Sequence, residues 1–166
     1  MTGHVAPQDE QTPRLLVSAC LAGVPCRYDA LSRPDAQIVA AVERGEAVAL
    51  CAEQLAGLPT PRPPAEIVGG DGADVLRGDA VVVTDAGEDV TAEFRDGAER
   101  VVGIAASLGI ERAILQARSP SCGCGEIYDG THSGTLVEGD GIVAAALRES
   151  GVHVTALRGG TSTPSE

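Results

Sequence analysis

The sequence predicts an α/β protein, a single three-layer domain with a mainly parallel, Rossmann-like sheet. Short apolar runs alternate with stretches of helical periodicity along the chain, which is the pattern of strands joined by crossover helices. The 166 residues contain one Phe, two Tyr and no Trp. The core must therefore be built from Val, Leu, Ile and Ala, side chains that suit buried parallel strands covered by helices. We expect the domain to span residues 14–158, with polar, disordered tails at 1–13 and 159–166.

Four short segments predict the strands of this sheet. They lie at residues 14–18, 47–50, 112–116 and 152–157, and the first three contain continuous apolar runs. Short apolar runs of this kind are typical of buried strands. The sheet is therefore expected to carry its ligand site at the carboxyl ends of these strands.

Three helices are expected between the strands. The first begins near Pro34 and ends at Gly45, with an apolar face formed by Ile38, Val39 and Val42. The second follows a cap at Asp89 or Thr91 and runs to Gly109. The third begins at a cap formed by Asp140 and ends at Gly151.

Two stretches between residues 51 and 90 are less regular. Residues 52–64 contain four prolines, so we expect an irregular but ordered connection there, with neither an ordinary helix nor a central strand. Residues 66–68 and 80–83 contain short apolar runs and could pair as a hairpin around a turn region at 69–78.

The charge balance restricts the partners. A formal net charge of -12 repels phosphate backbones, so no stable complex with a nucleic acid is expected. Arg27, Arg62 and Arg118 could form a small local exception, sufficient for one phosphate or a polar base. The amino-terminal segment has no apolar core like that of a signal peptide, and no run reaches membrane-spanning length. We expect a cytoplasmic protein, monomeric or homodimeric, whose partner is a small molecule.

Three of the five cysteines follow predicted strands. Cys20, Cys51 and Cys122 are far apart in sequence, but neighbouring parallel strands would bring them to one crevice. Thiolate ligands from separate loops suit zinc or an iron–sulfur cluster. Three ligands would leave a [4Fe-4S] cluster with one iron open to substrate, which makes the cluster a Lewis acid.

The other two cysteines leave alternatives open. Cys26 and Cys124 could each supply a fourth ligand, form a zinc site with their neighbours, or have no role at the site. The spacing of Cys122 and Cys124 is awkward for two ligands of one small cluster, which favours a bystander role for Cys124. Cys26 stands in a loop that looks exposed and is the better candidate for a spare thiol.

Several longer motifs make the prediction more specific. They are Ser-Ala-Cys-Leu-Ala-Gly at 18–23, Cys-Arg-Tyr-Asp at 26–29, Gly-Leu-Pro-Thr-Pro-Arg-Pro-Pro-Ala-Glu at 57–66, Asp-Val-Thr at 89–91, Ser-Pro-Ser-Cys-Gly at 119–123 and Ile-Tyr-Asp-Gly at 127–130. This set resembles the 2-thiouracil desulfidase family, from about Leu15 to Val154.

The resemblance implies a reaction and a set of residues. By this resemblance, Cys20, Cys51 and Cys122 are expected to hold a [4Fe-4S] cluster. The implied reaction replaces the sulfur of a thiolated pyrimidine by the oxygen of water, giving the oxo base and hydrogen sulfide without net redox change. The resemblance also implies an acid/base carboxylate, Glu53, and a catalytic serine, which is either Ser119 or Ser121.

Two positions depart from the pattern that the resemblance implies. Ala52 stands where a proline is expected between Cys51 and Glu53, which relaxes that loop but removes no chemistry. His132 stands where we expect Phe, so base stacking or substrate choice could differ, unless it is simply a surface histidine.

Two other functions compete with this interpretation. One is a structural or redox-sensing metal protein, with zinc or an iron–sulfur cluster, whose closed four-cysteine site includes Cys26 or Cys124. The other is a binding module that recognises a partner through the Pro-rich segment at 59–64.

Overall fold

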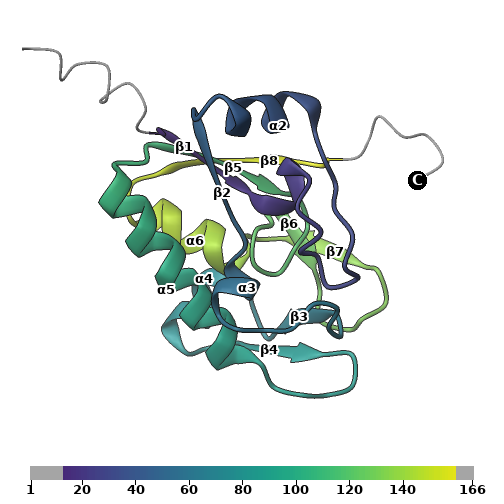
Figure 1. Ribbon diagram of the computed structural model, residues 1–166. Helices are drawn as coiled ribbons and strands as arrows, with labels where there is room; N and C mark the ends of the chain where they lie inside the picture. The colour runs from purple at the N-terminus through teal and green to yellow at the C-terminus, as the bar shows by residue number, and fades with distance from the viewer. Residues whose placement is uncertain (1–12, 160–166) are drawn as a thin grey trace, which may run out of the picture.

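The computed structural model describes residues 13–159 (Figure 1). The predicted disordered tails at 1–13 and 159–166 lie outside these residues, except for Pro13 and Gly159. Within residues 13–159, none of the helices combines the length and the apolar character needed to cross a bilayer.

A four-stranded parallel sheet forms the centre of the fold, as predicted. Its strands are β1 (Leu15–Ser18), β2 (Ala47–Leu50), β5 (Arg112–Gln116) and β8 (His153–Leu157). Their order is β2-β1-β5-β8, with every neighbouring pair parallel. The chain therefore moves in one direction across the sheet after β1 and in the other direction after β5. In open α/β sheets ligands bind at such a reversal.

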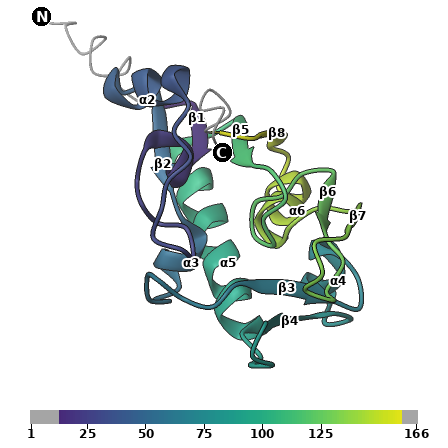
Figure 2. The ribbon, with the colours of Figure 1, turned by 90° about the vertical axis from the view of Figure 1, so that its right-hand side faces the viewer.

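Helices cover both faces of the sheet, which gives the predicted three layers (Figures 1 and 2). On one face α2 (Ala36–Glu43) packs Ile38 into a cluster with Val17. On the other face α5 (Thr91–Leu108) and α6 (Ile142–Glu149) pack into a larger core that contains Leu16. Successive residues of a strand point to opposite faces, so Leu16 and Val17 divide between the two cores.

Two antiparallel hairpins lie beyond the carboxyl edge of this sheet. The predicted pairing of 66–68 with 80–83 is present as β3 (Ala65–Val68) and β4 (Val81–Thr84). A second hairpin, β6 (Glu126–Tyr128) and β7 (Leu136–Glu138), follows the Cys122 loop and was not predicted, because its strands are three residues long. Both hairpins form walls of the candidate site described below.

Three short helices also depart from the sequence-based expectation. The turn region at 69–78 contains α4 (Gly72–Arg77), whose first turn carries a capping box between Asp71 and Asp74. A 3-10 turn, η1 (Ala19–Ala22), follows β1 directly. The prediction that residues 52–64 exclude a helix was wrong at their start, where α3 (Ala52–Leu55) forms one turn before the first proline.

The single turn of α3 is held by packing on α5. A Cβ atom added at Gly97 of α5 would overlap the carbonyl group of Ala52, so this glycine permits the close approach of the two helices. An isolated four-residue helix is unstable in water, and tertiary packing must supply its stability. Because α3 begins directly after Cys51, this contact also sets the position of the site.

We expect Gly97→Ala to destabilise the protein by about 1–3 kcal/mol, because α3 must shift to relieve the overlap. Gly103→Ala on the same helix is the matched control, since a Cβ atom there meets nothing within 4 Å. The control should gain stability by up to about 1 kcal/mol from the higher helix propensity of alanine. Urea unfolding measures both; equal effects at the two positions would contradict the packing argument.

Candidate functional site

The three strand-end cysteines line one cavity at the carboxyl edge of the sheet. Cys20 lies in η1 after β1, Cys51 directly follows β2, and Cys122 lies in the loop after β5. The strands β2, β1 and β5 are adjacent, which brings these segments together. The cavity has a volume of about 410 Å³. Small-molecule sites have volumes of about 300–1,000 Å³, so a single ring system fits here better than a folded polymer.

Backbone and side-chain contacts fix the cysteine-bearing segments. Ser18 Oγ accepts a 2.8 Å hydrogen bond from the backbone N–H of Gln116, which ties the end of β1 to the end of β5. The thiol of Cys20, which is buried, lies 4.0 Å from Gln116 Oε1. Cys51 is the N-cap residue of α3. The segments that carry the thiols are therefore linked to one another at the ends of the strands.

Burial and mutual contact raise the pKa values of three of the cavity thiols. Desolvation raises the pKa of the Cys122 thiol to about 12. A hydrogen bond with Cys20 raises the pKa of Cys26 to about 11. The pKa of Cys51 is also raised, first by its hydrogen bond with Cys26 and then by burial. Thiolate is the form that binds metals, so a metal entering this cavity must displace protons from these groups.

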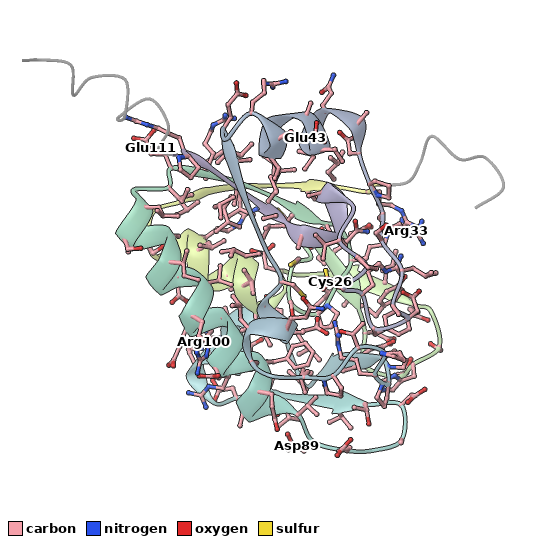
Figure 3. The ribbon with its side chains drawn as sticks, viewed as in Figure 1. Cys26, Arg33, Glu43, Asp89, Arg100 and Glu111 are labelled. Carbon is pink, nitrogen blue, oxygen red and sulfur yellow. The ribbon has the colours of Figure 1, made fainter. Side chains whose placement is uncertain are left out.

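Cys26 is buried, contrary to the expectation that its loop is exposed. Its residue is 2% exposed and packs with Cys20 and Cys51, and its side chain lines the same cavity. Figure 3 shows Cys26 inside the molecule, between the end of β1 and the β3–β4 hairpin. The loop is drawn inward because the Cys26 carbonyl accepts a 2.8 Å hydrogen bond from Arg62 Nη2. The cavity thus offers four thiols, not three.

Cys124 belongs to a different environment. Its Sγ accepts a 2.7 Å hydrogen bond from Arg148 Nη2 on α6 and lies 3.8 Å from the carbonyl of Val154 on β8. It is not one of the residues that line the cavity. This placement agrees with the bystander role favoured by its spacing from Cys122.

Glu53 and Ser121 form a hydrogen-bonded pair in the wall of the cavity. Glu53 is the second residue of α3, and its Oε2 accepts a 3.0 Å hydrogen bond from Ser121 Oγ. The other oxygen, Oε1, accepts a 2.8 Å bond from Arg62 Nε. Ser121 is 4% exposed and directly precedes Cys122. A carboxylate and a hydroxyl in contact beside a candidate metal site can move a proton to or from a bound molecule.

Ser119, the other candidate serine, contacts the backbone of its own loop. Its Oγ accepts hydrogen bonds from the N–H groups of Ser121 at 3.0 Å and Cys122 at 3.1 Å. Gly123 completes this turn, since a Cβ atom there would lie 2.7 Å from the Ser119 carbonyl. These contacts are those of a residue that shapes the loop around Cys122.

The cavity wall concentrates positive charge in an acidic protein. Arg27, Arg62 and Arg118, the three arginines singled out from the sequence, all line it. Two more do so from other parts of the chain, Arg33 and Arg158. Five of the 12 basic residues therefore surround a single cavity, against three acidic residues in the same wall. This local field favours a ligand with an anionic or strongly polar group.

His132 lines the cavity as well, in the loop between β6 and β7. Its backbone N–H donates to Glu66 Oε1 at 3.1 Å, and its Nδ1 lies 3.7 Å from Glu66 Oε2. Its φ of 58° is left-handed, a conformation in which His is enriched among residues other than glycine. The position that departs from the expected Phe thus faces the site.

Soft thiol donors from separate segments suit zinc or an iron–sulfur cluster. Among residues 13–159, no three His, Cys, Asp or Glu side chains are arranged to hold one ion. Structural zinc needs four donors at about 2.0–2.3 Å from one point. In an iron–sulfur cluster each cysteine binds a different iron, so the thiols stand farther apart. Cys20, Cys51 and Cys122, with Cys26 beside them, could hold such a cluster.

Sequence reasoning missed the contacts that surround Glu53. Arg62 was considered only as a possible ligand of a phosphate or a polar base, yet it pairs with Glu53 and holds the Cys26 loop. The only signal was the dense Pro-rich segment around Arg62, which indicated an ordered loop without indicating its partner. Gln116, at the end of β5, gave no signal beyond its place at a strand end.

Comparisons with known proteins identify the family of the chain. A family profile described as 2-thiouracil desulfurase matches residues 15–157. The chain is 45% identical over 140 residues to the uncharacterized protein YbbK of Bacillus subtilis (strain 168), an alignment that covers 84% of this chain and 93% of that protein. It also matches the solved structure of the [4Fe-4S]-dependent thiouracil desulfidase TudS with a TM-score of 0.76 and 41% sequence identity, covering 92% of this chain and 94% of that one.

Proposed function

The chain belongs to the 2-thiouracil desulfurase family, and from this premise we propose that it is an iron–sulfur-dependent desulfidase. The reaction replaces sulfur by oxygen in a thiolated pyrimidine base, nucleoside or nucleotide, as in the conversion of thiouracil to uracil. The observation that carries the proposal is the meeting of three strand-end cysteines with the Glu53–Ser121 pair in one cavity.

We assign the cofactor, a [4Fe-4S] cluster, to Cys20, Cys51 and Cys122. Soft thiolate ligands from three separate loops support this assignment, as does the name of the structural neighbour, which is [4Fe-4S]-dependent. Held by these three cysteines, the cluster would supply Lewis-acid chemistry toward the sulfur of the substrate.

The residues of the chain supply the proton transfers. Thiouracil and water give uracil and hydrogen sulfide, so two protons must move from water to the departing sulfur while no electrons are gained or lost. Glu53 accepts a proton from water, directly or through the hydroxyl of Ser121, and returns it to the leaving group.

The cavity wall recognises the substrate. Its arginines suit the polar edges of a pyrimidine or the phosphate of a nucleotide. Tyr28 and His132 provide flat surfaces at the same wall, against which a ring can stack. A small substrate needs no extended binding surface for a nucleic acid, which agrees with the net charge of -12.

The direct test is an anaerobic assay on protein loaded with iron and sulfide. With 2-thiouracil as substrate, we expect uracil and sulfide to be released in equal amounts over many turnovers. A loaded protein that releases neither from thiouracil, thiouridine or thiouridine monophosphate would contradict the proposed function.

One observation favours a second candidate function. Cys26 supplies a fourth thiol beside Cys20 and Cys51, so the cavity could close a cluster completely and serve as a structural or redox-sensing centre. Under this alternative Cys26→Ser loses bound iron. Under the desulfidase proposal the variant keeps its iron, because three ligands suffice.

The contacts of the two serines lead to a prediction. Ser121→Ala should lower kcat by about 10- to 100-fold, the equivalent of one hydrogen bond to a charged group. Ser119→Ala should leave kcat within a few-fold and lower the free energy of unfolding by about 0.5–2 kcal/mol, since its hydroxyl caps two backbone donors. Steady-state kinetics and urea unfolding of both variants measure these effects. A larger loss of kcat in Ser119→Ala than in Ser121→Ala would make Ser119 the catalytic serine.

A further inference from the structure

We propose that Arg62 is a positioning residue for the reaction, which holds the carboxylate of Glu53 so that one chosen oxygen faces Ser121 and the cavity. The inference rests on the proposed function, because it concerns the geometry of the acid/base pair of that site. Arg62 acts through Glu53 and through the loop that carries Cys26.

The two oxygens of Glu53 have separate partners. Arg62 Nε donates to Oε1 at 2.8 Å, whereas Ser121 Oγ donates to Oε2 at 3.0 Å. The side chains of Arg62 and Glu53 are 6% and 15% exposed, so water competes little for the contact between them. Because Oε1 is held, rotation of the carboxylate is restricted, and Oε2 is the oxygen left for proton transfer.

The guanidinium group is itself fixed by partners other than Glu53. Its Nη1 donates to the carbonyl of Pro59 at 3.1 Å and to Thr60 Oγ1 at 2.9 Å. Its Nη2 donates to the carbonyl of Cys26 at 2.8 Å. The group is therefore anchored on two loops before it meets the carboxylate, which allows it to orient Glu53 instead of following it.

The backbone of Arg62 takes part in the same arrangement. Its N–H donates to the carbonyl of Tyr28 at 2.8 Å, so the Pro-rich loop lies alongside the loop of residues 26–29. One residue thus links the segment that carries a cavity thiol to the helix that carries the carboxylate. Arginine is suited to this role because its planar guanidinium group can donate to several acceptors on different segments at once. A lysine ammonium is too compact to reach all of them.

A purely structural role would have different consequences. If Arg62 only clamps the Cys26 loop, its removal should loosen the thiols and lower the iron content in proportion to activity. If it positions Glu53, the cluster should remain while the chemical step slows, because misplacement of a catalytic group by about 1 Å can lower the rate about 100-fold.

The test uses Arg62→Gln and Arg62→Lys with wild type, each loaded anaerobically with iron and sulfide. With 2-thiouracil we expect kcat of Arg62→Gln to fall about 100-fold at unchanged iron content, with KM changed by less than about three-fold. Arg62→Lys should recover part of the loss, since an ammonium can donate to Oε1 but cannot also reach both loops. Arg148→Gln is the matched control: its guanidinium pairs with Asp140 at 3.3 Å outside the cavity, and its kcat should be unchanged.

A second measurement does not depend on turnover. The crystal structure of Arg62→Gln without cluster should show the Glu53 carboxylate turned away from Ser121, with the backbone of the cavity in place. An unchanged carboxylate, a kcat close to that of wild type, or parallel losses of iron and activity would each overturn the inference. If wild type itself releases no sulfide from thiolated pyrimidines, the proposed function fails, and the crystal structure alone decides the role of Arg62.

Discussion

Glu53→Gln is expected to lower kcat for thiouracil by about 10²–10⁴-fold while the protein keeps its cluster. The amide has the shape of the carboxylate, and its oxygen can still accept the bond from Arg62 Nε. The group that faces Ser121 then becomes a donor and cannot take a proton. The reason for the loss is therefore the missing base, not a changed cavity.

The measurement is steady-state sulfide release, with iron determined on the same sample. Glu66→Gln is the matched control, because Glu66 is another poorly exposed carboxylate of the same wall, where it accepts from the N–H groups of Gly130 and His132. Its kcat should change by less than about ten-fold, an effect far smaller than that of removing the base. Full activity of Glu53→Gln would rule out the assignment of Glu53 as acid/base residue.

Replacing any one of the three strand-end cysteines should remove the cluster and all turnover. Cys20→Ser, Cys51→Ser and Cys122→Ser each leave only two of the assigned ligands, and a hydroxyl is a poor ligand for a soft metal site. Cys124→Ser should keep both iron and activity, because its thiol contacts Arg148 and the carbonyl of Val154 instead of the cavity.

These variants should remain folded. The core is formed by apolar side chains of the sheet, α2, α5 and α6, and it does not depend on the metal. Circular dichroism melting of the three variants without cluster should therefore match that of the wild-type protein without cluster. Retention of iron by Cys51→Ser or Cys122→Ser, or its loss from Cys124→Ser, would contradict the ligand assignment.

The parts of the fold that depend on local pattern could be predicted from the sequence. The segments that form β1, β2 and β5 were recognised by their short apolar runs, and β8 by its place after the last helix. The order of the strands in the sheet, in contrast, does not follow from the sequence of any single strand. The expectation that three cysteines would meet depended on β2, β1 and β5 being neighbours, which follows from the direction of each crossover.

The elements that were missed owe their stability to tertiary contacts. Residues 52–55, Ala-Glu-Gln-Leu, all favour a helix, but one turn is too short to be stable alone, and its packing at Gly97 of α5 supplies the missing stability. Cys26 was expected to be exposed because Gly, Pro, Arg, Tyr and Asp surround it in sequence. It is buried because Arg62, 36 residues later, binds its carbonyl. Contacts of this kind define much of the site and leave little trace in local sequence.

The choice between Ser119 and Ser121 shows the same limit. Both serines lie beside Pro120, and sequence spacing treats them alike. They differ in the structure because one hydroxyl points to backbone N–H groups and the other to Glu53 Oε2. The partner that distinguishes them is 68 residues away along the chain.

The central claim, that this cavity holds a cluster used for desulfuration, is tested most directly by metal analysis coupled to turnover. The protein is reconstituted anaerobically with iron and sulfide, and iron, acid-labile sulfide and uracil production from 2-thiouracil are measured on one sample. We predict about four irons and four sulfides per chain, with uracil formed in proportion to the iron content of each preparation. A protein that takes up zinc in place of iron, or forms a full cluster and converts no thiolated pyrimidine, would contradict it.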